Sequence, residues 1–323
     1  MKPLWGTNVF FFCMVILWLA ITCDLGQAQS TRTDTASSYL ERGNQWLAKR
    51  ELERAIADYD LAIASAPDLD KAYYNRGIAR VLKGELEGAL ADFDRTLKLN
   101  PNMLEAYIDR GSIKSLQGDW DSALRDNSKA IELNPRISEA WHNRGMAHFQ
   151  QGALTEALAD LNQAVKLNPK RADYYGGRGT IKFKLCDYEG AITDFSQEIK
   201  LMPAKAQAWS DRGSAHAAKG EWDTAFKDFN QAITLDPRLA VAYFGRAAAW
   251  KEKGDLERAV SDYDRSIETN PQFADAFAQR GMCRLRQGRE AAAQADFDEC
   301  LRLNPSLKFS LEEEIKKVRR NHK

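Results

Sequence analysis

Apolar residues recur at helical spacing along most of the chain, in short blocks separated by turn residues. Residues 138–151 (SEAWHNRGMAHFQQ) predict an amphipathic helix that Gly152 ends, and residues 154–168 (LTEALADLNQAVKLN) predict a second helix with Pro169 just beyond it. One apolar stripe in this second segment is formed by Ala157, Leu158, Leu161, Ala164 and Val165. No segment alternates with a period of two, so the pattern predicts helices and no strands.

This block of two helices returns at a fixed interval. Prolines stand 34 residues apart, at positions 67, 101, 135, 169, 203, 237, 271 and 305. A constant period of this length is typical of stacked repeats, in which each unit buries its apolar face against its neighbours. Eight units fit between residues 36 and 307. The sequence therefore predicts an all-α solenoid of eight helix-turn-helix repeats.

A short motif marks the first helix of most units: an aromatic residue, then Arg three positions later and Gly four positions later. It reads YYNRG at residues 73–77 and WHNRG at residues 141–145. Glycine inside a helix costs about 1 kcal/mol relative to alanine, so a recurring one needs a packing reason. Every unit also has alanine twelve residues after that position. We expect these small residues to let the two helices approach closely, with the aromatic side chain filling the space beside them.

The arginine of this motif occurs in all eight units, and an aspartate follows it sixteen residues later in each. The arginines could form a row of anion-binding groups, or they could pair with the aspartates between the helices of each unit. A partly buried guanidinium requires a partner, which favours the ion pairs. The expected pairs include Arg76 with Asp92, Arg110 with Asp126, Arg144 with Asp160, and Arg212 with Asp228.

The N-terminal segment differs from the rest of the chain. Lys2 precedes an apolar run over residues 9–22 (VFFFCMVILWLAIT), and small residues follow as far as Ala28. This order predicts a signal peptide over residues 1–28 and an exported protein, periplasmic or secreted, with residues 29–35 as a linker. The alternative is an uncleaved membrane anchor over residues 4–23, although the apolar run is shorter than the roughly 20 residues of a membrane span.

Charge and motifs argue against catalysis and against nucleic-acid binding. The chain has 46 basic and 46 acidic residues, whereas binding to phosphates needs concentrated basic charge. It lacks the H-E-x-x-H, G-x-x-x-x-G-K-[ST] and G-x-S-x-G motifs. We expect no catalytic residues, no cofactor, no metal site and no nucleic-acid partner. For Cys283 and Cys300 in the last unit we expect core packing, with a disulfide as the alternative.

The units resemble tetratricopeptide repeats, whose pattern is W-x2-L-G-x2-Y, then A-x3-F and then P over 34 residues. The resemblance covers residues 36–307. Two positions depart from the family: the seventh is Arg in every unit, and the eleventh is mostly a basic residue or Trp instead of Tyr. The resemblance implies a right-handed α-solenoid that serves as a non-enzymatic scaffold for a protein or peptide segment. The alternative role is a membrane-held structural adaptor that assembles an envelope complex.

In the family, the first helices of the repeats line a concave binding surface. Carried onto this sequence, the resemblance implies an apolar groove in units two to five. Its expected residues are Tyr74, Ile78, Val81, Ile108, His142, Met146, Phe149 and Phe183. The alternative is that some of these side chains pack between neighbouring first helices. Units five to seven offer mostly polar side chains at these positions, with Phe244 as an apolar one, and we expect less binding at Ser210 and Ser214.

Residues 308–323 predict a capping helix with a basic tail, because a terminal repeat needs a cover with one polar face. The residues expected to cover the last repeat are Phe309, Leu311, Ile315 and Val318.

Overall fold

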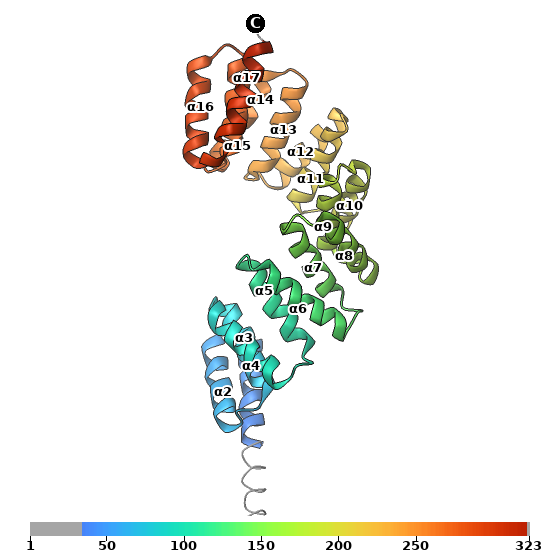
Figure 1. Cartoon of the computed structure of the whole chain (residues 1–323), viewed down its shortest axis with the longest axis vertical. Coiled ribbons are helices and arrows are strands. Elements are labelled where there is room, and N and C mark those ends of the chain that lie inside the picture. Colours follow the sequence, from blue (N-terminus) through green and yellow to red (C-terminus); the bar gives the residue numbers. More distant parts are fainter. Residues whose placement is uncertain (1–33, 322–323) are drawn as a thin grey trace, which may run out of the picture. The chain divides into compact units, whose positions relative to one another are not determined.

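The computed structural model describes residues 34–321, and every regular element in that range is a helix (Figure 1). The described chain divides into two compact units, the first ending at Ala147 and the second beginning at His148. The segment predicted as a signal peptide or anchor, residues 1–28, lies outside the described residues. The all-helical prediction is confirmed for the part of the chain that the structure describes.

In the first compact unit, which ends at Ala147 and contains several repeats, consecutive helices form pairs joined by short turns. The helices are a segment over residues 34–48, α2 (Leu52–Ser65), α3 (Asp70–Lys83), α4 (Leu86–Leu99), α5 (Leu104–Leu116), α6 (Trp120–Leu133) and most of α7 (Ser138–Gln150). Helix α3 packs against α4, and α5 packs against α6. Each pair also contacts the next one, through α2 with α3 and α4 with α5.

The second unit continues the same arrangement to the end of the described chain. Its helices after α7 are α8 (Leu154–Leu167), α9 (Ala172–Lys184), α10 (Tyr188–Leu201), α11 (Ala206–Ala218), α12 (Trp222–Leu235), α13 (Ala240–Glu252), α14 (Leu256–Thr269), α15 (Ala274–Arg286), α16 (Glu290–Leu303), the short 3-10 helix η1 (Pro305–Leu307) and α17 (Lys308–Asn321). The first helices of successive pairs touch as well, because α11 contacts both α9 and α13.

The turn inside each pair depends on one residue in the left-handed region of backbone space. Gly84 has φ +88°, its N–H donates to the Val81 carbonyl, and the N–H of Glu85 donates to the Arg80 carbonyl. Glycine adopts this conformation without a steric penalty, and so it ends the helix cleanly. Cys186, with φ 62°, takes the same place in another turn, where glycine would be less strained.

The prolines that set the period lie in the turns between pairs. At six of the eight prolines, the Asn or Asp side chain before the proline accepts a hydrogen bond from the backbone N–H two residues later. Asn134 Oδ1 accepts from the N–H of Arg136 at 3.0 Å, and Asp236 Oδ1 accepts from the N–H of Arg238 at 2.9 Å. This turn and the fixed φ of proline together end the second helix. The same bond is made by Asn100, Asn168, Asn270 and Asn304.

The recurring glycine makes room for an aromatic ring of the second helix. A Cβ atom added to Gly77 would lie 2.7 Å from Phe93 Cε1, and one added to Gly179 would lie 2.8 Å from Phe195 Cε1. The rings in this position are fully or almost fully buried: Tyr59, Phe93, Phe195, Phe229 and Phe297. Ala89, twelve residues after Gly77, is fully buried in the same cluster as Phe93.

The aromatic residue four positions before the glycine has a different role from the one expected. Trp141 Nε1 donates to the carbonyl of Pro135 at 2.9 Å, and Trp209 Nε1 donates to the carbonyl of Pro203 at 2.9 Å. The guanidinium of Arg144 lies 4.8 Å above the Trp141 ring, within the range of a cation–π contact. The expectation that this ring fills the space beside the glycine is wrong, because the second-helix ring occupies it.

The predicted capping helix is present as α17. Leu311 and Val318 are 4% and 9% exposed in a cluster with Phe297, and Ile315 packs against that cluster. Phe309 is 78% exposed, so the expectation that it covers the last repeat is wrong. Phe309 precedes Leu311 by two residues, so its side chain is rotated by about 200° around the helix axis and projects from the opposite side.

Both buried cysteines of the last pair are free thiols. Cys283 packs in a cluster with Tyr263 and Val260, whereas Cys300 packs in another cluster with Phe297 and Leu311. They therefore act as small core residues in this structure.

Candidate protein-binding surface

The arginine of the repeated motif reaches the aspartate of its own second helix. Arg76 Nη2 lies 2.6 Å from Asp92 Oδ1, and Arg110 Nε donates to Asp126 Oδ2 at 2.8 Å. Each aspartate is buried and accepts from both Nε and Nη2, which is the bidentate geometry of strong ion pairs. The same geometry joins Arg42 to Asp58, Arg178 to Asp194, Arg212 to Asp228, Arg246 to Asp262 and Arg280 to Asp296.

Arg144 and Asp160 belong to the same repeat, but they lie in different compact units of the structure. Each has contacts within its own compact unit. Arg144 Nη1 donates to Ser128 Oγ at 3.3 Å in the first unit. In the second unit, Asp160 Oδ2 lies 3.8 Å from His148 Nε2.

Each of these arginines after Arg42 also donates a hydrogen bond to the preceding helix pair, which the sequence analysis did not predict. Arg76 Nη1 lies 2.5 Å from Asp60 Oδ1, and Arg110 Nη1 lies 2.6 Å from Asp94 Oδ1. These partners precede the arginine by sixteen residues, so one guanidinium links the second helices of two successive pairs. The sequence could have indicated this bond, because a polar residue stands sixteen positions before the arginine as well as sixteen positions after it. With its donors used in this way, the guanidinium serves the stacking of repeats.

The eleventh position supplies a further donor to the same buried carboxylate. Arg80 Nη1 donates to Asp92 Oδ2 at 2.8 Å, and Lys182 Nζ lies 2.8 Å from Asp194 Oδ2. Trp46 Nε1 donates to the equivalent aspartate, Asp58, at 3.1 Å. In these three repeats, the departure from tyrosine at this position adds a donor to the polar network around the aspartate, whereas Lys114 Nζ lies 4.0 Å from Asp119 Oδ2 instead.

In the first unit, the residues predicted for the groove are largely engaged in packing. Tyr74 Oη donates to Asp109 Oδ2 at 2.8 Å, and the Tyr74 ring lies 5.8 Å from that of Phe93. Ile108 is 6% exposed in a cluster with Ile131. Ile78 and Val81 pack against the cluster of Phe93, while His142 and Met146 are half-buried.

In the second unit, the two predicted groove residues also contact the core. Phe149 packs against the cluster of Leu161 and Ile181, and Phe183 packs against that of Phe195. The Phe183 ring also lies 5.4 Å from the ring of Tyr188. These contacts correspond to the alternative in which the bulky residues pack between neighbouring helices. The eight predicted residues belong to two units, and the structure describes no single surface that joins them.

A concave hollow lies instead between α11 and α13 in the second unit, which we call the α11/α13 hollow. Its volume is about 460 Å³. The apolar part of its lining includes Trp222, Phe229, Val241 and Phe244. Ser210 and Ser214 also line it, although sequence reasoning expected little of them. A volume of a few hundred Å³ is typical of ligand sites.

Small side chains on α11 leave this space open. The fifth, ninth, twelfth and thirteenth residues of the repeat are Ser210, Ser214, Ala217 and Ala218, and all four line the hollow. No other repeat has small residues at all four positions. In the repeat that contains α7, the corresponding residues are His142, Met146, Phe149 and Gln150. The local loss of side-chain volume was the sequence signal for the hollow.

The floor of the hollow is a ring shared by two repeats. Phe229 of α12 is fully buried and lies beneath Gly213 of its own pair. A Cβ atom added to Gly245 of α13 would lie 2.6 Å from Phe229 Cε1. Glycine at residue 245 thus lets α13 approach the ring, and the hollow opens above this contact.

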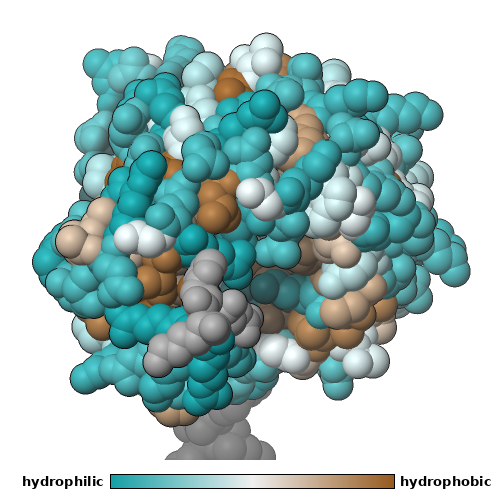
Figure 2. Space-filling model, turned by 90° about the horizontal axis from the view of Figure 1, so that it is seen from above, coloured by the Kyte–Doolittle hydropathy of each residue, from teal (hydrophilic) through white to brown (hydrophobic). Residues whose placement is uncertain are grey.

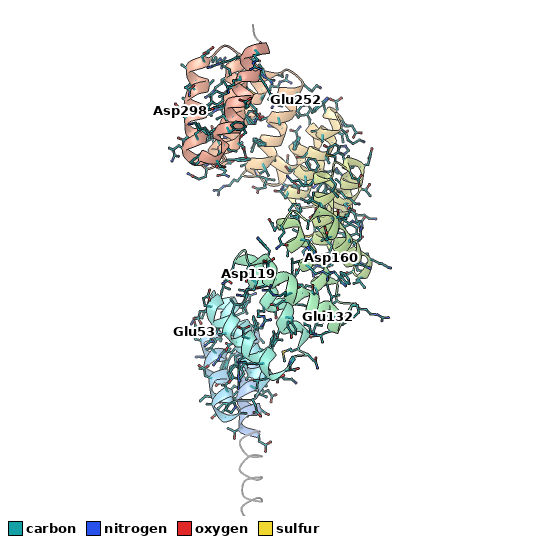
Figure 3. The ribbon with its side chains drawn as sticks, viewed as in Figure 1. Glu53, Asp119, Glu132, Asp160, Glu252 and Asp298 are labelled. Carbon is teal, nitrogen blue, oxygen red and sulfur yellow. The ribbon has the colours of Figure 1, made fainter. Side chains whose placement is uncertain are left out.

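The polar edge of the hollow is acidic. Of the residues that line it, Asp211 and Glu252 are acidic and none is basic; Figure 3 labels Glu252 on α13. Gln207 Nε2 donates to Asp211 Oδ1 at 2.7 Å. Burial raises the pKa of the Asp211 carboxyl to about 6; the Gln207 hydrogen bond lowers it by less, the negative charge of Glu198 raises it, and the positive charge of Lys205 lowers it. An apolar space thus lies beside a partly desolvated carboxyl group.

Residues 34–321 contain neither a cluster of metal-ligating side chains nor a helix that could span a membrane. No group of three or more His, Cys, Asp or Glu side chains in that range could hold a metal ion. Within the same range, no helix combines the length and the apolar character needed to cross a membrane.

Paired helices with a 34-residue period and a repeated aspartate network define an α-helical repeat protein. Family models described as tetratricopeptide repeat match residues 70–103, 138–171, 206–239 and 244–307, which together make up more than half of the chain. The chain therefore belongs to the tetratricopeptide repeat family. No curated protein matches its sequence.

Solved structures show the same fold. A tetratricopeptide repeat protein from Parabacteroides merdae is similar with a TM-score of 0.60 and 18% identity, over 83% of this chain and 99% of that one. PilF from Pseudomonas aeruginosa is similar with a TM-score of 0.57 and 17% identity, over 64% of this chain and 94% of that one. A chain of the APC/C hetero-tetramer Cut9–Hcn1 is similar with a TM-score of 0.59 and 18% identity, over 81% of this chain and 48% of that one.

Proposed function

We propose that this protein is a non-enzymatic scaffold that binds a protein or peptide segment on its first helices, and that the α11/α13 hollow is the principal contact. The observation that carries the proposal is the hollow itself, about 460 Å³ in volume. Apolar space that the fold leaves open to solvent is typical of interaction sites. The proposal thus moves the main contact from repeats two to five to first-helix positions, such as Ser210 and Ser214, where the sequence predicted less binding.

The contacts of the other candidate residues support this choice. Tyr74 and Ile108 in the first unit, and Phe149 and Phe183 in the second, already pack against buried neighbours. A partner that bound them would gain less newly buried apolar area than one that entered the hollow. Val241 at the edge of the hollow is 38% exposed, so a partner would remove an apolar side chain from water there.

Site-specific photocrosslinking in the native host tests the proposal. A photoreactive residue at Ser214 should form a defined adduct with a partner protein, whereas one at Lys227, exposed on α12, should not. The adduct should disappear when Ala217→Phe fills the hollow, since Phe149 and Phe183 show that the repeat accommodates phenylalanine at this position. Equal adducts at Ser214 and Lys227, or none at Ser214, would overturn the proposal.

For the N-terminal part of the chain, we propose export and an array of eight repeats. Export rests on the apolar run of residues 9–22. The eighth repeat rests on the helix pair formed by residues 34–48 and α2, which precedes the residues that the family models match. N-terminal sequencing of the mature protein tests export. A start at Gln29 supports a soluble exported binder, a membrane-bound form that retains residues 4–23 supports the anchored adaptor, and a full-length cytosolic form contradicts export.

A further inference from the structure

We infer that the α11/α13 hollow selects a partner segment that carries a bulky apolar side chain, aromatic or long aliphatic, immediately beside a lysine or arginine. This inference rests on the proposed function and adds the chemistry of the partner. It follows from two features that meet at one place, an apolar hollow and two carboxylates with no basic residue among those that line it.

The apolar half of the recognition comes from the lining of the hollow. Trp222 and Phe229 of α12 and Phe244 of α13 present aromatic rings, while Ala248 and Ala217 keep the space between them open. Figure 2 shows one face of the molecule, on which patches of hydrophobic residues lie among hydrophilic ones. A single bulky side chain that inserts into the hollow suits its apolar lining, because buried apolar anchors dominate binding energy.

The charged half comes from Asp211 and Glu252. The nearest lysines have other partners: Lys205 Nζ donates to Glu198 Oε1 at 2.6 Å, and Lys251 Nζ donates to Gln279 Oε1 at 2.9 Å. Lys251 Nζ is 3.6 Å from Glu252 Oε1, so Glu252 has only a loose cationic neighbour. A cation from a partner would relieve the partly desolvated carboxylate of Asp211 and pair with Glu252.

The acidic character is local to the hollow, which allows it to orient a segment. The neighbouring depression between α13, α15 and α17 is lined by Lys251, Arg286 and Lys317, with Glu314 as its acidic residue. A cationic side chain would be favoured at the hollow and disfavoured at this depression. Because the hollow is acidic and the depression is mostly basic, a bound segment should place its cationic end over α11.

Selection from a random peptide library by the purified full chain tests the inference. We expect enrichment of peptides in which Phe, Trp, Leu or Met adjoins Lys or Arg. Ser214→Met together with Ala217→Phe should weaken binding of the selected peptide by about tenfold or more. Both substitutions place a residue that other repeats carry at the same position, as Met146 and Phe149 do, so the fold tolerates them.

Removal of one negative charge from the hollow tests the preference for a cation separately. Asp211→Asn should remove the preference for Lys or Arg over Gln while binding to the apolar residue persists. Asp109→Asn is the matched control, since Asp109 holds the sixth position of its own repeat as Asp211 does, but lies outside the hollow. Enriched peptides without a cation would overturn the inference while the proposed function stood. Full binding by the filled variant would overturn both the inference and the hollow as the principal contact.

Other occupants give distinct results. If the chain binds itself through the hollow, sedimentation will show a dimer that Ala217→Phe converts to a monomer, and the inference is wrong. If photocrosslinking at Ser214 yields no partner, the proposed function itself fails, whatever the library shows.

Discussion

Tyr74 Oη donates a hydrogen bond to Asp109 Oδ2 at 2.8 Å, and this bond links the first helices of two successive repeats, α3 and α5. Burial raises the pKa of the Asp109 carboxyl above its usual range, the Tyr74 bond lowers it, and the negative charges of Glu139 and Glu105 raise it. Tyr74 is thus the hydrogen-bond donor that offsets the desolvation of a half-buried carboxyl group. The side chain that the family pattern suggested for ligand contact has a structural partner.

Removal of the Tyr74 hydroxyl should therefore destabilise the first unit. Tyr74→Phe leaves the half-buried Asp109 without that donor, and we expect a loss of about 1–2 kcal/mol in the free energy of unfolding. The pKa of Asp109 should rise further, which NMR titration of its carboxyl carbon would detect. Tyr73→Phe is the control, because the Tyr73 hydroxyl bonds to the Pro67 carbonyl at an exposed site. Equal effects of the two substitutions would show that the Asp109 bond contributes nothing special.

Gly77 should not tolerate even one methyl group. In Gly77→Ala the new Cβ would lie 2.7 Å from Phe93 Cε1, and overpacking of this kind costs about 1–3 kcal/mol. Phe93→Leu in the same chain should recover part of the loss, as measured by chemical unfolding. Gly88→Ala is the control: its Cβ would meet the flexible side chain of Arg80 at 3.1 Å, so no loss is expected. Unchanged stability of Gly77→Ala would show that Gly77 does not lie against the Phe93 ring.

The two carboxylate partners of Arg110 should differ in importance. Asp126 has a side chain 9% exposed, whereas that of Asp94 is 64% exposed. Asp126→Ala leaves a partly buried guanidinium without its bidentate partner and should cost about 2–4 kcal/mol. Asp94→Ala should cost less than about 1 kcal/mol, since exposed ion pairs contribute little. Urea unfolding of both variants decides the matter, and similar losses would contradict the assigned roles.

Asp211 should make the stability of the second unit depend on pH. Its pKa is raised from 3.8 to about 6, so the folded chain holds this proton over a range in which the unfolded chain has released it. Stability should fall as the pH rises from about 4 to about 6, by on the order of 1–2 kcal/mol, and then level off. Asp211→Asn should lack this contribution. Melting temperatures of the two proteins across that range test the prediction, and parallel curves would exclude it.

Much of the fold could be predicted from the sequence because its determinants are local. The helix stripes and the Arg–Asp spacing of sixteen residues are each readable along the chain. The ion pairs follow from the same periodicity, since one period places each Arg and Asp at equivalent positions. The second bond of Arg110, to Asp94 of the preceding pair, was not predicted, because it depends on how successive pairs stack.

The sequence by itself determined the repeat, the helix ends and the pairing of charges, since turn residues and side-chain spacing act over short distances. Only the tertiary structure decided which first-helix residues are engaged and where space is left. Tyr74 meets Asp109 from 35 residues away, and Phe229 reaches under Gly245 of the next pair. The α11/α13 hollow exists because α13 rests on the Phe229 ring while Ser214 and Ala217 are too small to fill the volume above it. Such volume is a property of several packed elements together, and no single stretch of sequence encodes it.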